Sequence, residues 1–169
     1  MKIFCPARII KTMNIKSIHP CKIEGITETG EEKTFTPDDF LNKTTVLYFY
    51  PNDGTPGCTI QAGDFRDNMK YIRPYAAVVG VNRDTIESHK KFMKNEDLNF
   101  ILLSDPDKKL IDFFGVWGEK PAYGIGFMGI IRSTFIINKK GDILKSWFNV
   151  QVEGHVDEIL KELRDEKSS

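Results

Sequence analysis

The chain of 169 residues, 40% hydrophobic and 28% charged, has the composition of a single globular domain. Its 24 basic and 24 acidic residues balance, so we expect no nucleic-acid partner, and no apolar run approaches the roughly 20 residues that cross a membrane. The three cysteines are too few for a disulfide framework and form no metal-ligand spacing with the three histidines, so neither metal nor cofactor is expected.

Residues 1–16 are predicted to form a mobile N-terminal extension, and residues 17–169 to form one domain. The first 23 residues carry basic side chains and no acidic one, but their apolar pieces are far shorter than the roughly 7–15 residues of a secretory signal. Free thiols favour a reducing compartment, so we expect a cytoplasmic protein, with organellar targeting by the basic N-terminus left open. Met13 is an alternative start of translation.

The first half of the chain predicts a hairpin, a strand and a long helix. Residues 29–31, Thr-Gly-Glu, lie between two alternating segments and indicate a β-hairpin. Residues 46–50 form a continuous apolar run, which is typical of a strand covered on both faces. Pro56 is suited to the first turn of a helix, and Pro74 marks its end. One face of this helix carries the apolar stripe Cys58, Ala62, Phe65, Met69 and Ile72.

The second half continues the alternation of strands and helices. Strands are predicted at 76–81, 101–103, 133–137 and 143–150, the last two around a turn at 138–141. Asp84 with Glu87 indicates a capping box for a helix to about residue 96, and Asp107 is expected to cap a small helix. A final helix has its apolar face at Val152, Val156, Ile159, Leu160 and Leu163. This order predicts an α/β fold, with a mixed sheet flanked by helices on both faces.

Cys58 lies where the strand turns into the long helix. A free cysteine on an apolar helix face is commonly an inert core residue. The first turn of a helix, however, offers unpaired N–H groups and the positive end of the helix dipole, and both stabilise a thiolate. A helix terminus typically contributes only ~0.3–1 kcal/mol, so we expect a fixed cation as well. Arg132, at the entrance to the strand at 133–137, is the candidate.

Residues 48–68, YFYPNDGTPGCTIQAGDFRDN, resemble the active-site signature of peroxiredoxins, most closely the peroxiredoxin Q or bacterioferritin comigratory protein group. Residues 88–92, 103–107, 115–120 and 132–135 match the same group in the same order, so the resemblance covers roughly residues 20–165. It implies a thioredoxin-like fold and thiol-dependent reduction of hydrogen peroxide and organic hydroperoxides, in a monomer or homodimer that contributes to antioxidant defence and cell redox homeostasis.

The resemblance also assigns four site residues. It implies that Cys58 is the peroxidatic cysteine, that Thr55 hydrogen-bonds the peroxide, that Pro51 shields the thiolate and that Arg132 is the active-site guanidinium. In this reading the Cys58 thiolate attacks a peroxide oxygen and becomes a sulfenic acid. Taken alone, Thr55 is a helix N-cap residue and Arg132 a solvated cation at a strand edge.

Two positions depart from the pattern of the group. Gln61 replaces a common glutamate, and Gly63 stands where many members have a resolving cysteine. Positions 58 and 63 are about 140° apart around a helix, so a resolver there requires local unwinding. We therefore expect a one-cysteine cycle, in which thioredoxin, glutaredoxin or glutathione reduces the sulfenic acid. The alternative is a two-cysteine cycle, with Cys21 or Cys5 as resolver from the same or another subunit.

Two other functions are weighed against peroxidase activity. A thiol–disulfide oxidoreductase of the same fold is disfavoured, because Thr55 occupies the place of the first cysteine of a CxxC motif. A non-enzymatic redox sensor or chaperone would use Cys58 only as a switch.

The glycine-rich segment 124–129 fits the letters GxGxxG, but it leads into a strand and not a helix, so nucleotide binding is not expected. It is expected to form a loop at the rim of the thiol site. Trp117, Tyr123 and Phe127 are either packing residues or an apolar collar for an organic peroxide.

Overall fold

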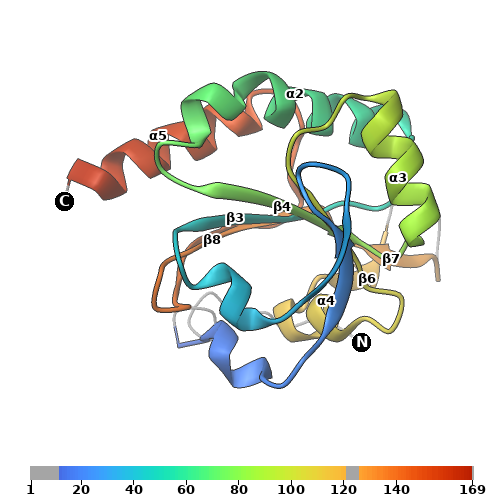
Figure 1. Cartoon of the computed structure of the whole chain (residues 1–169), viewed down its shortest axis with the longest axis horizontal. Coiled ribbons are helices and arrows are strands. Elements are labelled where there is room, and N and C mark those ends of the chain that lie inside the picture. Colours follow the sequence, from blue (N-terminus) through green and yellow to red (C-terminus); the bar gives the residue numbers. More distant parts are fainter. Residues whose placement is uncertain (1–11, 121–125, 169) are drawn as a thin grey trace.

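The computed structural model describes residues 12–120 and 126–168, which are built around a seven-stranded mixed sheet (Figure 1). The strand order is β2-β1-β5-β4-β3-β8-β9, with β3, β4 and β5 parallel and the other pairs antiparallel. The strands are β1 (Ile23–Ile26), β2 (Glu32–Phe35), β3 (Thr45–Phe49), β4 (Ala77–Asn82), β5 (Ile101–Ser104), β8 (Ser133–Ile137) and β9 (Ile143–Trp147). The predicted mixed sheet and the N-terminal hairpin, formed by β1 and β2, are confirmed.

Helices cover both faces of this sheet. In Figure 1, α2 and α5 lie above the sheet, α3 beside it, and α4 with the N-terminal segment below it. A separate ribbon of two strands, β6 and β7, follows α4. The bounds are η1 (Ile15–Ile18), η2 (Pro37–Phe40), α2 (Pro56–Ile72), α3 (Ile86–Asn95), α4 (Lys109–Phe114), β6 (Trp117–Glu119), β7 (Met128–Ile130) and α5 (His155–Ser168). None of the helices in the described ranges is long and apolar enough to cross a membrane.

The central strand β3 separates two hydrophobic cores. All five of its residues are buried, and because side chains alternate along a strand they point to opposite faces. Val46 and Tyr48 join the core under α2 and α5, whereas Leu47 and Phe49 join the core that includes residues of α4. The uninterrupted apolar run read from the sequence is therefore explained by burial on both sides.

Two helix starts differ from the sequence prediction. Thr85, not Asp84, is the N-cap of α3, and its hydroxyl accepts a hydrogen bond from the backbone N–H of Ser88 at 3.2 Å. Asp105, not Asp107, serves the start of α4, since its carboxylate accepts three hydrogen bonds from the backbone N–H groups of residues 109, 110 and 111. Asp84 and Asp107 were wrong predictions, because local sequence does not show that Asp84 accepts a hydrogen bond from Asp53 or that Asp105 already bonds the start of α4.

The chain ends also differ from expectation. Asn14 and Ile15, within the predicted extension, contact the turn between β8 and β9: the backbone N–H of Ile15 donates to the Gly141 carbonyl, and Asn14 Nδ2 donates to the Asp142 carboxylate at 2.7 Å. Residues 1–11 lie outside the described part, so the extent of the extension stays a prediction. At the other end, α5 begins at His155, so Val152 precedes the helix.

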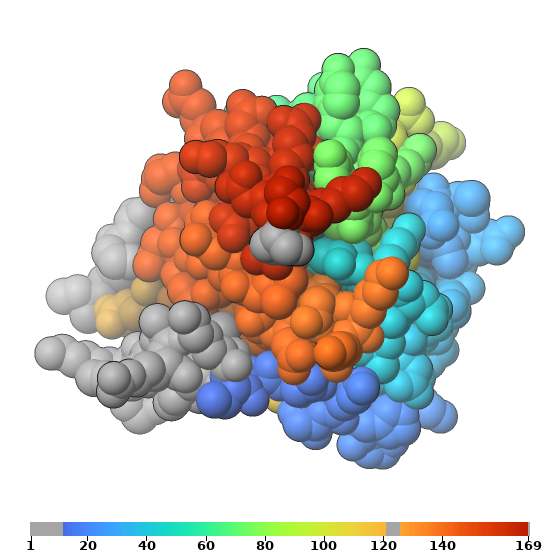
Figure 2. All heavy atoms as spheres, turned by 90° about the vertical axis from the view of Figure 1, so that its left-hand side faces the viewer, coloured from blue at the N-terminus to red at the C-terminus, as the bar shows by residue number. Residues whose placement is uncertain are grey.

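Helix α5 packs along α2, the helix that carries Cys58, and the two helices cover the same hydrophobic core. Figure 2 shows the red C-terminal helix against the green segment at the end of α2. The Lys167 ammonium of α5 lies 5.1 Å from the centroid of the Tyr75 ring. His155, the first residue of α5, is buried, and its Nε2 is 2.8 Å from the hydroxyl of Thr134. Burial lowers the pKa of His155 to about 4, so the folded protein holds this imidazole neutral.

We therefore predict that stability falls as the pH drops from about 6.5 towards 4. In this window an unfolded chain protonates the imidazole of His155, whereas the folded chain does not, so the free energy of unfolding decreases by up to about 1.4 kcal/mol per pH unit. Urea unfolding of the wild type and His155→Gln at several pH values measures the difference. His19→Gln is the control, because His19 is exposed beside Asp38. Parallel pH profiles for the wild type and His155→Gln would contradict the prediction.

Candidate active site

Cys58 lies on a strand–turn–helix unit formed by β3, residues 50–55 and α2. Thr55 has extended backbone angles at the N-cap position, and its carbonyl accepts the first helical hydrogen bond from Thr59 N–H at 2.8 Å. Cys58 is the third residue of α2, so its backbone N–H has no acceptor within the helix. The side chain is only 1% exposed. The predicted position of the thiol at a helix N-terminus is thus confirmed, in a nearly closed environment.

Sheet register brings Arg132 to this thiol. Strand β8 pairs antiparallel with β3 so that Ser133 lies opposite Phe49, the last residue of β3. Arg132 immediately precedes Ser133 and therefore lies beside the start of α2. Its Nη2 is 3.3 Å from the Cys58 sulfur. A guanidinium at this distance stabilises a thiolate through a charge-assisted hydrogen bond.

The same guanidinium is held by Gln61, one turn after Cys58. Arg132 Nη1 donates to Gln61 Oε1 at 2.6 Å, and Gln61 is buried. Because an amide is neutral, it orients the guanidinium without cancelling its charge. Gln61 Nε2 is buried without a hydrogen-bond partner among the described residues, which leaves a donor available near the thiol. The sequence pattern singled out Gln61 as a departure from the usual glutamate but did not predict this contact with Arg132.

Thr55 and Pro51 lie on the loop that precedes the thiol. The Thr55 hydroxyl does not cap the helix; it donates to the Asn52 carbonyl at 3.2 Å. Pro51 and Asn52 line a cleft together with residues of the β6–β7 ribbon, among them Trp117, Lys120, Phe127, Met128 and Ile130. The loop thus carries a hydroxyl and a proline ring shortly before Cys58 in the chain, and their contacts with the thiol and with substrate stay predictions.

The β6–β7 ribbon gives this cleft an apolar and cationic rim. The ring of Trp117 contacts two cations, with the Lys108 ammonium 4.6 Å and the Arg83 guanidinium 5.1 Å from its centroid. Phe127 is 49% exposed. Burial, and then the charge of Arg132, lower the pKa of Lys120, with Cys58 acting in the opposite direction. The predicted glycine-rich loop, residues 124–129, is described only from Gly126 onwards, and its last two residues, Met128 and Gly129, belong to strand β7. Residues 121–125, including Tyr123, lie outside the described residues, so a loop at the rim stays a prediction.

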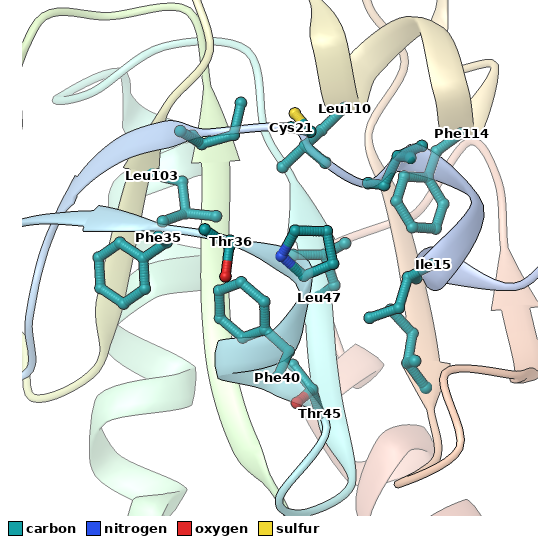
Figure 3. A pocket seen from close by; sticks show the side chains of 14 residues that line it. Ile15, Cys21, Phe35, Thr36, Phe40, Thr45, Leu47, Leu103, Leu110 and Phe114 are labelled. Atoms are coloured by element: carbon teal, nitrogen blue, oxygen red, sulfur yellow. The ribbon is translucent and has the colours of Figure 1, made fainter.

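Cys21 lies on the opposite side of the sheet from Cys58. Figure 3 shows its sulfur beside Leu110 in an apolar pocket that also contains Phe114. It packs against the core of α4, whereas Cys58 belongs to the core under α2 and α5. Burial raises the pKa of the Cys21 thiol, which reduces its thiolate fraction. The structure therefore does not bring Cys21 to Cys58; Cys5 lies outside the described residues.

A buried polar network supports the loop, and sequence reasoning gave it no role. The carboxylate of Asp53 accepts hydrogen bonds from Tyr50 and Asn82 on Oδ1, at 2.7 and 3.0 Å, and from Ser88 on Oδ2 at 2.8 Å. His89 Nδ1 is 2.6 Å from Oδ2, and its Nε2 is 2.9 Å from the Leu103 carbonyl. The only sequence signal was the match of residues 88–92 to the peroxiredoxin Q pattern, which assigned no chemistry.

Comparison with known proteins identifies the family of the chain. The model of the AhpC/TSA family matches residues 21–146. Peroxiredoxin Bcp of Bacillus subtilis is 45% identical over 134 residues, covering 79% of this chain and 85% of the relative. A putative peroxiredoxin of Helicobacter pylori is 46% identical over 126 residues, covering 74% and 83%.

Solved structures show the same fold. The bacterioferritin comigratory protein of Xanthomonas campestris matches with a TM-score of 0.81 at 32% identity, over 91% of this chain and 96% of that one. A cysteine-to-serine variant of PrxQ from Xylella fastidiosa gives 0.81 at 34% identity, over 89% and 92%. The fold and the thiol site define a thiol-dependent peroxidase with a thioredoxin-like fold. The chain belongs to the AhpC/TSA family, among the peroxiredoxin Q or bacterioferritin comigratory proteins.

Replacing Arg132 is expected to slow the reaction of Cys58 with hydrogen peroxide. A hydrogen bond to a charged group contributes about 1.5–3 kcal/mol, which corresponds to a loss of roughly 10- to 100-fold in Arg132→Met. Arg132→Lys retains the charge but cannot bond Cys58 and Gln61 at once through two guanidinium nitrogens, so its rate constant should be intermediate. Stopped-flow fluorescence gives the rate constants. Arg66→Met is the matched control, since Arg66 lies on α2 and bonds Asp67 and the Glu96 carbonyl. Equal rates in Arg132→Met and the control would contradict this role.

Proposed function

We propose that the protein reduces hydrogen peroxide and organic hydroperoxides through a sulfenic acid on Cys58, and that a separate thiol restores the cysteine. The observation that carries this proposal is the 3.3 Å contact between Arg132 Nη2 and the Cys58 sulfur at the start of α2. It combines a nucleophile, a fixed positive charge and unpaired helix N–H groups in one place.

In the first step the Cys58 thiolate attacks one peroxide oxygen, and the O–O bond breaks. Sulfur is oxidised to sulfenic acid, while the other oxygen leaves as hydroxide or alkoxide and takes a proton to become water or alcohol. Negative charge develops on the leaving oxygen. Arg132, the Cys58 N–H and the Thr55 hydroxyl are the proposed donors that stabilise it. Pro51 is proposed to shield the thiolate from water.

The cleft beside this loop supports organic peroxides as substrates. Trp117 and Phe127 give it apolar surface next to Pro51 and Asn52. The structure of the Xanthomonas campestris relative is described in terms of alkyl peroxide reduction, which agrees with such a substrate. The proposed collar around the thiol would receive the organic group, while the peroxide oxygens face Cys58.

In the second step an external thiol attacks the sulfenic sulfur and releases water, giving a mixed disulfide. A second thiol then attacks this disulfide, restores Cys58 and leaves as the oxidised reductant. Thioredoxin, glutaredoxin or glutathione are the proposed donors. The position of Cys21 across the sheet supports this cycle over an intrachain disulfide, because a disulfide needs Cα atoms within about 7 Å. We retain the prediction of a monomer or homodimer.

Substitution of the cysteines tests the cycle. Cys58→Ser is expected to abolish peroxide consumption, whereas Cys21→Ser and Cys5→Ser should keep both rate and turnover with added thiol. Mass spectrometry after one equivalent of peroxide should show one added oxygen on Cys58, trapped by dimedone. A disulfide between Cys58 and Cys21 or Cys5 would overturn the one-cysteine cycle. Oxidation without turnover, with every thiol tested, would favour a redox sensor.

Gly63→Cys is expected to introduce an intramolecular resolver. A Cβ at position 63 meets only the Arg66 guanidinium, at 3.4 Å, so the thiol fits the folded helix. The two sulfurs would be about 140° apart around α2, so a disulfide requires its first turns to unwind. One equivalent of peroxide should then yield a disulfide between positions 58 and 63 in the variant.

Gly63→Ser, of similar size, is the control and should give only the sulfenic acid. A persistent sulfenic acid in Gly63→Cys would show that α2 does not open on the timescale of the assay.

A further inference from the structure

The chain buries a second charged pair next to the thiol loop, which the chemistry described above does not use. Asp53, two residues before Thr55, is almost fully enclosed: the side-chain exposure of His89 is 0% and that of Asp53 is 5%. Charged groups buried to this degree require partners, because the loss of hydration is costly. The hydrogen-bond partners of Asp53 and His89 indicate which atoms of the two side chains carry protons.

The carboxylate is ionised. It accepts from four donors, the Tyr50 hydroxyl, Asn82 Nδ2, the Ser88 hydroxyl and His89 Nδ1, at 2.6–3.0 Å. An ionised carboxylate has about four lone-pair positions and only accepts, so this arrangement fills it. Burial acts to raise the pKa of Asp53, but the hydrogen bond and charge of His89, with the bonds from Tyr50 and Ser88, outweigh it and hold the pKa below its ordinary value.

His89 has an acceptor atom facing each of its two ring nitrogens. Its Nδ1 faces the ionised carboxylate, and its Nε2 faces the backbone carbonyl of Leu103, which has no proton to donate. Two acceptors are matched by a ring that carries a hydrogen on each nitrogen, and such a ring is an imidazolium. The pair joins α3 to the end of β5 and to the thiol loop in one bonded unit.

The pair also lies within electrostatic range of the active site. Burial, and then negative charge on Cys58 and Asp53, raise the pKa of the Tyr48 phenol well above its ordinary value, while Arg132 acts in the opposite direction. Asp53 and Cys58 thus act on the same buried phenol. An uncompensated carboxylate at Asp53 would repel a thiolate at Cys58 and oppose Arg132.

We infer that His89 is a positioning residue for the peroxidase reaction: its buried imidazolium cancels the charge of Asp53 and fixes the loop that carries Thr55 and leads to Cys58. The loop is further held by the Asp53 N–H, which donates to Asp84 Oδ2 at 2.7 Å. This inference rests on the proposed role of Cys58. The charged and titratable groups that face the pair are Tyr50 after β3, Asp53 in the loop and Asp84 after β4. Helix α3 carries Glu87 and Lys90 near His89 in the chain, and β5 contributes a backbone carbonyl.

Charge compensation and simple structural support predict different patterns in a double-mutant cycle. His89→Gln leaves the carboxylate uncompensated, so the rate constant of Cys58 with hydrogen peroxide at pH 7 should fall about tenfold, and the pH–rate profile should move to higher pH. Asp53→Asn removes the repelling charge, so its rate should equal or exceed that of the wild type. The double variant should return to within about threefold of the wild type, because both charges are gone.

NMR of the wild type provides an independent test that needs no variant. The two ring nitrogens of His89 should show imidazolium shifts at pH 8, above the ordinary histidine pKa of about 6.5. His19→Gln is the control for the rates and should leave them unchanged. A neutral His89 ring at pH 8, or two single variants that slow the reaction alike with an additive double variant, would overturn the inference.

If His89→Gln does not fold, the inference is tested by the NMR signals of the wild-type His89 ring and by the rate of Asp53→Asn. A neutral ring at pH 8, or a slow Asp53→Asn variant, would then overturn it. Failure of the proposed function looks different: Cys58→Ser would then consume peroxide as fast as the wild type, whatever the state of the ring.

Discussion

The pairing of β3 with β8 is the constraint on which the site depends. It places Ser133 opposite Phe49, and so fixes the backbone of Arg132 at the level where β3 ends and α2 is about to begin. The helix supplies the thiol and the strand supplies the cation, from positions 74 residues apart in the chain. A slip of one residue in this pairing would turn the Ser133–Ile137 side chains to opposite faces of the sheet and remove the guanidinium from the sulfur.

Around this contact the protein uses polar groups of two kinds. Close to the sulfur, Arg132 is held by a neutral amide, so its charge remains directed at the thiol. Further back, a carboxylate is present but is enclosed by four donors. Both arrangements serve one electrostatic requirement, because positive potential at the sulfur favours the thiolate form. One position that often carries a glutamate holds the neutral Gln61, and the carboxylate of Asp53 is hydrogen-bonded to four donors.

Local sequence was sufficient for the thiol helix and insufficient for its surroundings. The apolar run before Pro51 and the proline at position 56 specify a strand and a helix start through short-range rules, and both were predicted. The caps at Asp84 and Asp107 were wrong, because Asp84 is engaged by the N–H of Asp53, 31 residues away, and Asp105 already serves the start of α4. Arg132 was proposed from its place before a strand and from family resemblance, since nothing local reveals a partner across a sheet.

The burial of Cys58 has a kinetic consequence. A sulfur that is 1% exposed suits a peroxide of a few atoms, but a protein thiol needs more room to form a mixed disulfide. In the proposed cycle its approach requires the first turns of α2 to separate from the core, and Gly63 lowers the cost of that opening by roughly 1 kcal/mol relative to alanine. Oxidation and recycling then sample different conformations of one helix. Amide hydrogen exchange in residues 57–63 reports the frequency of this opening, which sets an upper limit on turnover when a macromolecular reductant is in excess.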